Sequence, residues 1–490
     1  MPKFQIKQKK TGEVLYRGRA GSLKELVQAA VQPEAQGSVS KLVFAKLGLK
    51  KLTKTRLYGA DFRATDLSEI DLTEAELTGS DLSNSNLSGS CLKKAILNRC
   101  DLTAANLSRA SLGDADLSEC NLTAAKFTKA VVETANLTSA NLKHADLARL
   151  KLNRVNFTDA NLSGVLLTSS DLSRNQLSGV NLAGADLSWA ILVGTKLERT
   201  DLTRANLERA DLAGAKLAGA TLTGVNLVSA NLQGADLTGA NLENAKMSSA
   251  NLGGAKLKGA KMAGVVLDGA KLVEADLSDC DLTGADLSDT DISRASFSNA
   301  QMTGANLQRV LSQGVALSGA NLANGSLVKA TLSQSNLTRA RLENADFRGA
   351  AMDESDLSGA FMAGANLSQA NLQKSDLTRV DLTGADLTKT ILTDAKMMEV
   401  KAPGANLSHA ALQNVNLDGA DLSGVNLTET NMTGVKMKGA SFVGAVMMLA
   451  DFSWAAIEKS NFSGVKVSKT SFRGAKLVDV KGIKFKSKPL

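Results

Sequence analysis

The chain has 490 residues, of which 43% are hydrophobic but only 3% aromatic, and its formal net charge is +8. It contains no run of about 18 apolar residues, which excludes a membrane-spanning helix, and its first residues lack the apolar core of a signal peptide, so we expect a cytoplasmic protein. Residues 1–60 contain 13 Lys and Arg against 3 Asp and Glu, and residues 476–490 contain 5 Lys against Asp479, so the region between them carries a net charge of −6.

The first forty residues do not repeat. Phe4 and Ile6 alternate with polar residues, as do Val14 and Tyr16 after a Gly-containing turn, which predicts a β-hairpin over residues 4–16. Ser22-Leu23-Lys24-Glu25 has the spacing of a capping box and predicts a short helix to about residue 31. Repeat proteins need an atypical terminal unit, so residues 1–40 are interpreted as a ββα cap, a partner-binding head, or both.

A five-residue repeat governs the rest of the chain. The five-residue register runs from Leu57 to Leu477 without insertion or deletion, which makes 85 repeats, and nearly all of its key positions have a large apolar residue. A period of five fits neither an α-helix nor a flat strand. We therefore expect two residues of each repeat to point inward and three outward, with a turn in every repeat, often at a Gly two places after the large residue. The core ladder is typified by Leu222, Leu227, Leu232 and Leu237 and by the small residues Ala220, Ala230 and Ala235.

The sequence Ala235-Asp236-Leu237-Thr238-Gly239 shows the full pattern. This pattern resembles that of pentapeptide-repeat proteins over roughly residues 42–480. The resemblance implies an all-β solenoid, a right-handed quadrilateral β-helix with four repeats in each coil and about 21 coils in all. At about 4.8 Å per coil, such a solenoid would be roughly 100 Å long. We accordingly divide the chain into the head (1–40), the β-helix (41–480) and a basic C-terminal tail (481–490).

Several positions depart from the Leu and Ala pattern. Phe442, Phe452, Phe462 and Phe472 take the large position at every tenth residue, so they are predicted to lie on two opposite sides and to plug the C-terminal end of the core. Asn175 replaces a small inward residue, Ser312 replaces a Leu, and Ala402-Pro403 falls where Leu and its successor should be. These three sites are either functional breaks or tolerated packing variations.

The sequence offers little support for catalysis. His144 and His409 lie at outward positions more than 260 residues apart in a solenoid, so they cannot form one site. No metal-ligand spacing, phosphate-binding loop or nucleophile elbow occurs. We therefore predict a protein that is not an enzyme and that has no cofactor or metal site. Asp61, Asp81 and Asp101 could stack and hold a cation, but the column continues as Asn residues and is interpreted as a surface ladder.

Three of the four cysteines take the small inward position. Cys100 and Cys120 are twenty residues apart, so they are expected on successive coils, near enough for a disulfide. The alternative, which we prefer, is that they serve as small buried apolar residues.

Exposed aromatic residues and basic clusters are the best candidates for contacts. Trp189 and Trp454 fall at outward positions, and Arg209 should lie one coil from Trp189, so these three residues are candidate contacts for a protein partner. Nine basic residues near the N-terminus are candidate nucleic-acid contacts: Lys7, Lys9, Lys10, Arg17, Arg19, Lys50, Lys51, Lys54 and Arg56.

Three functions follow from these features. The uninterrupted repeats favour a rigid, non-enzymatic scaffold that binds proteins through its surface and ends, in a bacterial or phage assembly or a virion. The resemblance implies an alternative, a DNA mimic that regulates or protects DNA gyrase or topoisomerase IV. However, a duplex of about 100 Å carries roughly 60 negative charges, against −6 here. A third function is sequence-blind nucleic-acid binding through the basic ends.

Overall fold

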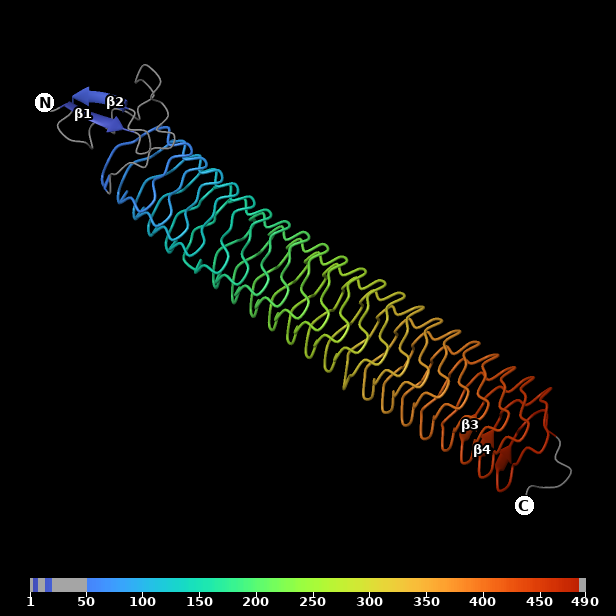
Figure 1. Cartoon of the computed structure of the whole chain (residues 1–490). Coiled ribbons are helices and arrows are strands. Elements are labelled where there is room, and N and C mark those ends of the chain that lie inside the picture. The colour runs from blue at the N-terminus through green and yellow to red at the C-terminus, as the bar shows by residue number, and fades with distance from the viewer. Residues whose placement is uncertain (1–2, 8–13, 20–50, 484–490) are drawn as a thin grey trace. The chain divides into compact units, whose positions relative to one another are not determined.

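The computed structural model describes residues 3–7, 14–19 and 51–483 of a chain that divides into two units, Met1–Asn241 and Leu242–Leu490. In the first unit, strand β1 (Lys3–Lys7) pairs antiparallel with β2 (Val14–Arg19), with a register shift between Ile6 and Lys7 (Figure 1). The predicted hairpin is thereby confirmed. The helix predicted after Ser22 lies outside the described residues.

The repeats of the first unit wind into coils of twenty residues. Each residue before a Leu bridges in parallel the residue twenty places later, as Asn206 bridges Asn226. Each coil both donates backbone hydrogen bonds to the next coil and accepts them from it. Leu222 N donates to Asn241 O (2.6 Å), and Asn241 N donates to Ala220 O (2.9 Å). Twenty residues contain four repeats, so each coil has four sides (Figure 1). The predicted quadrilateral β-helix is therefore confirmed.

A tight turn at each corner makes the five-residue period possible. The amide of the small residue closes the turn onto the preceding Leu, as Ala230 N does onto Leu227 O (3.0 Å). The residue between them that lies two places after the Leu has a positive φ, +58° at Ser229 and +63° at Gly234. This is the hydrogen bond and the φ sign of a type II turn. Glycine fits without strain, whereas a residue such as Ser229 adopts a φ that residues with a Cβ rarely adopt.

The inward positions form a narrow apolar core. Leu222, Leu227, Ala230 and Ala235 are at most 1% exposed, whereas the three other positions of each repeat are half-buried or exposed. Rings replace Leu at Phe62, Phe127 and Phe157 of the first unit without breaking the register. Leu and Ala therefore alternate around each coil, and the side chains of one coil pack on those of the next.

The second unit has the same construction and contains three longer strands. Strands β3 (Lys436–Lys438), β4 (Ala456–Glu458) and β5 (Lys476–Val478) form a parallel sheet in the order β3-β4-β5, in register at intervals of twenty residues (Figure 1). Met437 and Ile457 point into the core from β3 and β4. Among the described residues of the chain, no helix has the length and apolar character needed to cross a membrane.

The three departures from the repeat pattern leave the coil period unchanged. Asn175 is buried and its side-chain amide donates to Leu152 O (2.9 Å), which satisfies the polar group. Ser312 is buried and its hydroxyl has no hydrogen-bond partner within the described part of the chain. Ala402 is buried, its amide keeps the ladder bond to Asp421 O (2.8 Å), and Gly404 completes the turn after Pro403 with a φ of +69°. The coil period is the same before and after each site.

Candidate interaction surfaces

The largest exposed ring of the second unit lies at a corner of its last coils. Trp454 is 65% exposed. Its indole covers Gly474 one coil further on, where an added Cβ would lie 2.5 Å from the ring. Leu449 occupies the preceding corner of the same side and is 48% exposed, and Met448 beside it is 44% exposed. We call Met448, Leu449 and Trp454 the C-terminal patch.

Stacked rings lie in the core beneath this patch. Phe442 stacks on Phe462 with 4.7 Å between ring centroids, and Phe452 stacks on Phe472 at 5.0 Å. Phe452 also meets Phe442 and Phe462 edge-on at 6.2 and 6.3 Å. Phe452 points inward and Trp454 outward from the same repeat, so the ring cluster fixes the backbone that presents the patch. Phe472 is half-buried, whereas the other three rings are fully buried.

The exposed Trp of the first unit is partly engaged within the protein. Trp189 is 54% exposed, and the Arg209 guanidinium lies 4.7 Å from its ring centroid, as expected for a cation–π contact. Glu208 pairs with Arg209 at 3.8 Å. Ile191 and Val193 follow Trp189 at outward positions of the same side and are 44% and 36% exposed. Trp189 therefore belongs to a small apolar surface that has a charged neighbour.

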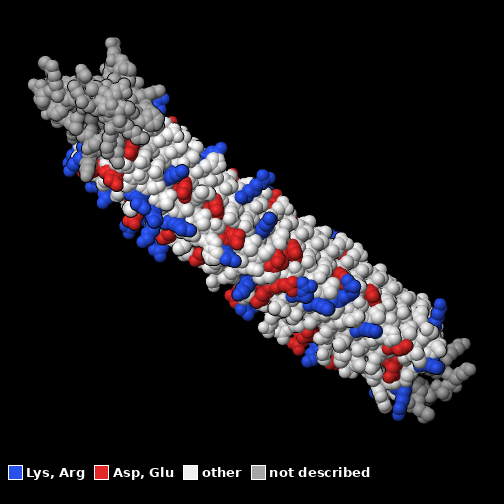
Figure 2. Space-filling model, viewed as in Figure 1, with Lys and Arg blue, Asp and Glu red and all other residues white. Residues whose placement is uncertain are grey.

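Several corner charges are paired from coil to coil. Arg99 pairs with Glu119 at 2.9 Å, and in the second unit Arg379 pairs with Glu399 at 2.8 Å, each pair being twenty residues apart. The hydrogen bond and the charge of Arg379 hold the pKa of Glu399 below its ordinary value. Figure 2 shows the result, with positive and negative side chains interspersed along the visible face. No continuous acidic surface is present on that face.

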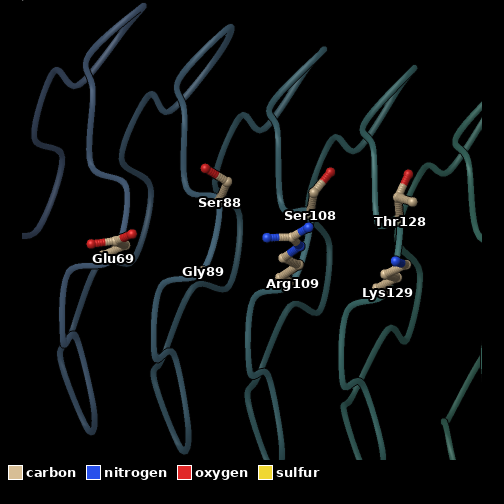
Figure 3. Close-up of a pocket in the computed structure, with 7 residues that line it drawn as sticks. All are labelled: Glu69, Ser88, Gly89, Ser108, Arg109, Thr128 and Lys129. Carbon is tan, nitrogen blue, oxygen red and sulfur yellow. The ribbon is translucent and has the colours of Figure 1, made fainter.

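One groove of the first unit places two cations next to each other. It has a volume of about 500 Å³ and runs across successive coils along one corner (Figure 3). Arg109 and Lys129 lie in line with Glu69 and Gly89, and a parallel row of hydroxyl groups comes from Ser88, Ser108 and Thr128. This groove can bind an anionic group through two cations and adjacent hydroxyl donors.

The structure places only part of the predicted N-terminal basic cluster. Lys54 pairs with Glu74 at 3.5 Å, and Arg56 pairs with Glu76 at 3.7 Å, so both charges are already compensated. Lys51 is exposed on the first described coil. Lys7, Arg17 and Arg19 lie in the hairpin strands, whereas Lys9, Lys10 and Lys50 fall outside the described residues.

The candidate acid–base and metal-binding residues have local partners. His144 Nδ1 lies 3.4 Å from Gly164 O, and in the second unit His409 Nδ1 lies 3.3 Å from Glu429. Asp61 pairs with Arg63 at 2.6 Å, and Asp81 and Asp101 each accept bonds from the residue two places later. Over residues 51–483 and the hairpin, no three His, Cys, Asp or Glu side chains gather as metal ligands would.

The four cysteines are free thiols of unequal accessibility. Cys100, Cys120 and Cys280 are buried, and Cys100 and Cys120 donate to Leu77 O and Leu97 O at 3.0 and 2.9 Å. A hydrogen bond with Cys100 and burial raise the pKa of Cys120, and burial raises the pKa of Cys280 to about 12. Cys91 is half-buried.

We expect a thiol-specific chromogenic disulfide reagent to modify Cys91 alone in the native protein and all four thiols in denaturant, because only the accessible thiolate reacts rapidly. The absorbance of the released thiolate measures the number modified. Rapid modification of two or more thiols under native conditions would contradict the buried positions of the other three, and the Cys91→Ser variant serves as the control.

Sequence reasoning found the two tryptophans and Arg209 beside Trp189, but not Met448, Leu449 or the aligned cations Arg109 and Lys129. Two corners that are five residues apart lie at the ends of one side of a coil, which places Met448 and Leu449 on the same side as Trp454. The cations Arg109 and Lys129 align because they are twenty residues apart, the length of one coil. Writing the outward residues in columns of twenty would reveal both groupings. Both groupings can therefore be found from the sequence when the length of a coil is known.

Comparison with protein families gave matches along most of the chain. The family described as Pentapeptide repeats (8 copies) matches in overlapping segments within residues 55–93, 170–309, 316–401 and 405–464. A second family, described as Pentapeptide repeat region, matches residues 90–167. Comparison with curated proteins gave no match.

Solved structures that resemble the chain include three pentapeptide-repeat or resistance proteins. HetL, involved in heterocyst differentiation regulation in the cyanobacterium Nostoc sp. strain PCC 7120, is 31% identical, with 49% of this chain and 91% of HetL covered and a TM-score of 0.23. A trypsin-treated variant of QnrB1, a plasmid-mediated fluoroquinolone resistance protein, is 16% identical over 41% of this chain and 90% of its own, with a TM-score of 0.24. A pentapeptide repeat protein from the Arabidopsis thaliana thylakoid lumen is 30% identical over 22% and 67%, with a TM-score of 0.10.

Proposed function

Because the chain belongs to the pentapeptide-repeat family, whose members fold as right-handed quadrilateral β-helices, we propose that it is a non-enzymatic scaffold that binds a protein partner through the surface of its coils. The observation that carries this proposal is the C-terminal patch. Three large apolar side chains, Met448, Leu449 and Trp454, are each 44% or more exposed on one side of a coil. Exposed apolar groups clustered in this way mark protein-binding surfaces.

The construction of the patch suits a binding role. Trp residues are frequent among the few residues that dominate binding energy, especially in rigid surroundings. Here Trp454 covers Gly474, and the stacked phenylalanines lie directly beneath its repeat. A ring held in this way loses little conformational freedom when a partner covers it.

Charge distribution favours this scaffold over the DNA mimic that the family resemblance also suggests. A DNA mimic has to present dense negative charge along its surface. In this chain several acids at the corners are paired with cations one coil away, as in Arg294–Glu274 (2.8 Å) and Arg309–Asp289 (2.6 Å) of the second unit. Such pairs leave little net field for a DNA-binding enzyme to recognise.

The scaffold proposal is tested by affinity capture with three forms of the full chain. A partner bound at the C-terminal patch should be retained by the wild-type protein and by Trp189→Ser, and lost with Trp454→Ser. Trp189 is the matched control because it is the other exposed Trp and lies in the other unit.

The captured partner is then purified and titrated directly against the same three forms. A central Trp contact should cost at least about 2 kcal/mol when truncated, which is roughly a thirtyfold loss of affinity. Equal affinity of the wild-type and Trp454→Ser forms for every captured protein would refute the proposed patch. Circular dichroism of each form shows whether the coils remain folded.

A further inference from the structure

One corner column of the first unit contains cations that no coil-to-coil ion pair neutralises. Arg109, Lys129 and Arg149 take equivalent corner positions in three consecutive coils, and Arg109 N donates to Thr128 O (3.0 Å) next to Lys129. All three side chains are exposed, and among the described residues none of the three forms an ion pair. Like charges on neighbouring strands repel each other. An anionic ligand would relieve this repulsion.

The adjacent corner of the same side repeats the arrangement. Arg154 and Arg174 are stacked twenty residues apart, and Lys151 lies between the two corners, where it bridges Asp171. A shallow hollow of about 280 Å³ is lined by Arg154, Arg174 and neighbouring polar residues. We call this surface the basic side; its cations are Arg109, Lys129, Arg149, Lys151, Arg154 and Arg174.

Few acids oppose these cations on the basic side. Glu69 lies two coils before Arg109 in the same column, and Asp114 lies two coils before Arg154 and accepts a bond from the Thr134 hydroxyl (2.6 Å). Glu133 is exposed between the two columns, and Asp171 accepts a bond from Ser173 N (2.9 Å) within its own turn. The stretch from Arg149 to Arg154 has three cations within six residues and no acid. The centre of the basic side is therefore positive.

An apolar surface continues the basic side. Trp189, Ile191 and Val193 occupy the same side two coils beyond Arg149 and Lys151, and each is at least 36% exposed. At about 4.8 Å between coils, the separation is roughly 10 Å, which an extended peptide covers in about three residues. A single extended segment can therefore contact both the cations and the apolar surface.

We propose that the basic side binds an extended acidic segment of a protein partner, with its carboxylates on Arg149, Lys151 and Arg154 and an apolar side chain about three residues away on Ile191 and Val193. Arginine and lysine supply charge-assisted hydrogen bonds to carboxylates. A single-stranded nucleic acid fits less well, because its bases need aromatic platforms. The one exposed aromatic ring on this side, Trp189, already stacks with Arg209.

This inference rests on the proposed scaffold function in that it names a second binding surface and the chemistry of its partner. The two surfaces lie in different units and share no residue. The Trp454→Ser form should therefore bind an acidic segment as the wild-type protein does. Either proposal can fail without the other.

The test is fluorescence anisotropy with the full chain and two labelled probes. The first probe is a short peptide with a cluster of glutamates followed after about three residues by leucines, and the second is an oligothymidylate of the same length. Titrations at about 0.15 M salt suppress weak long-range attraction. The wild-type protein should bind the peptide more tightly than the oligothymidylate.

Two triple variants separate the basic side from general charge. The first variant combines Arg149→Ser, Lys151→Ser and Arg154→Ser, and it should weaken peptide binding about tenfold or more. The second combines Lys256→Ser, Lys261→Ser and Lys271→Ser. It removes the same charge from the other unit and should leave peptide binding unchanged. Ile191→Ser with Val193→Ser should also weaken the peptide and leave the oligothymidylate unaffected.

Three results would overturn the inference. These are no binding of the peptide by the wild-type protein, tighter binding of the oligothymidylate, and an equal loss of peptide binding in both triple variants. All substitutions are at exposed positions, and circular dichroism verifies that each variant remains folded.

Discussion

The Ala235→Asp substitution is expected to unfold the coils around it. Ala235 is completely buried, and its amide closes a turn onto Leu232 O (3.0 Å). A carboxylate at this position would enter an apolar core that offers it neither water nor a cation. An uncompensated buried charge of this kind costs about 4–5 kcal/mol or more. Because each coil is stabilised by its neighbours, the loss should spread from the coil of Ala235 to the coils before it, including that of Trp189.

Tryptophan fluorescence can measure this loss locally. The chain has two tryptophans, and Trp189 is the one in the same unit as Ala235. In a Trp454→Phe background, urea titration followed at Trp189 should show a strongly lowered midpoint or an unfolded baseline for Ala235→Asp. The matched control is Gln233→Asp, which adds the same carboxylate at an exposed position two residues away. Equal midpoints for the two variants would mean that Ala235 does not face the core.

The Phe452→Ala substitution is expected to cost about 3–5 kcal/mol in the free energy of unfolding of the last coils. Phe452 is fully buried and contacts the rings of Phe442, Phe462 and Phe472. Its removal leaves a cavity and also loses aromatic contacts, each worth about 0.5–1.5 kcal/mol beyond area burial. Trp454 lies two residues away and reports the change in a Trp189→Phe background.

Phe361 supplies the control for this prediction. It is in the same unit but lies at an outward position and is 49% exposed. The Phe361→Ala variant should therefore change stability by no more than about 0.5 kcal/mol. Comparable losses for Phe361→Ala and Phe452→Ala would contradict the role of the stacked rings as the support of the C-terminal patch.

The fold could be predicted from the sequence because every repeat has to meet the same packing requirement. Leu227 and Ala230 illustrate it: the first must be large and buried, the second must be small, and a turn must separate them. A five-residue period satisfies these conditions in one arrangement, and 85 repeats leave no ambiguity in register. Gly at the corner, as at Gly234, indicated the positive φ that the turn requires.

The surfaces were harder to predict because they depend on side-chain contacts between coils. Nothing in the period shows that Arg209 stacks on Trp189, or that Trp454 lies over Gly474. The outward positions tolerate many residues, so their pairing follows from the twenty-residue spacing and from rotamers that only the structure provides. The predicted N-terminal basic cluster illustrates this limit, since Lys54 and Arg56 are paired with acids one coil away.

The two proposed surfaces would give each unit of the scaffold its own mode of binding. The C-terminal patch offers an apolar contact that is insensitive to salt. The basic side offers a charged contact that weakens as salt rises. Salt dependence therefore distinguishes the two modes of binding in any partner that is found.

The central claim, that this chain is a protein-binding scaffold and not a DNA mimic, is tested most directly by a DNA gyrase supercoiling assay titrated with the purified protein at low and moderate salt. We expect no inhibition at moderate salt, because many acidic corners are paired with cations one coil away, as Glu119 is with Arg99. Inhibition at low salt that disappears at moderate salt would indicate coating of the plasmid by basic residues. Inhibition that persists at moderate salt would contradict the claim and establish the chain as a competitor of duplex DNA.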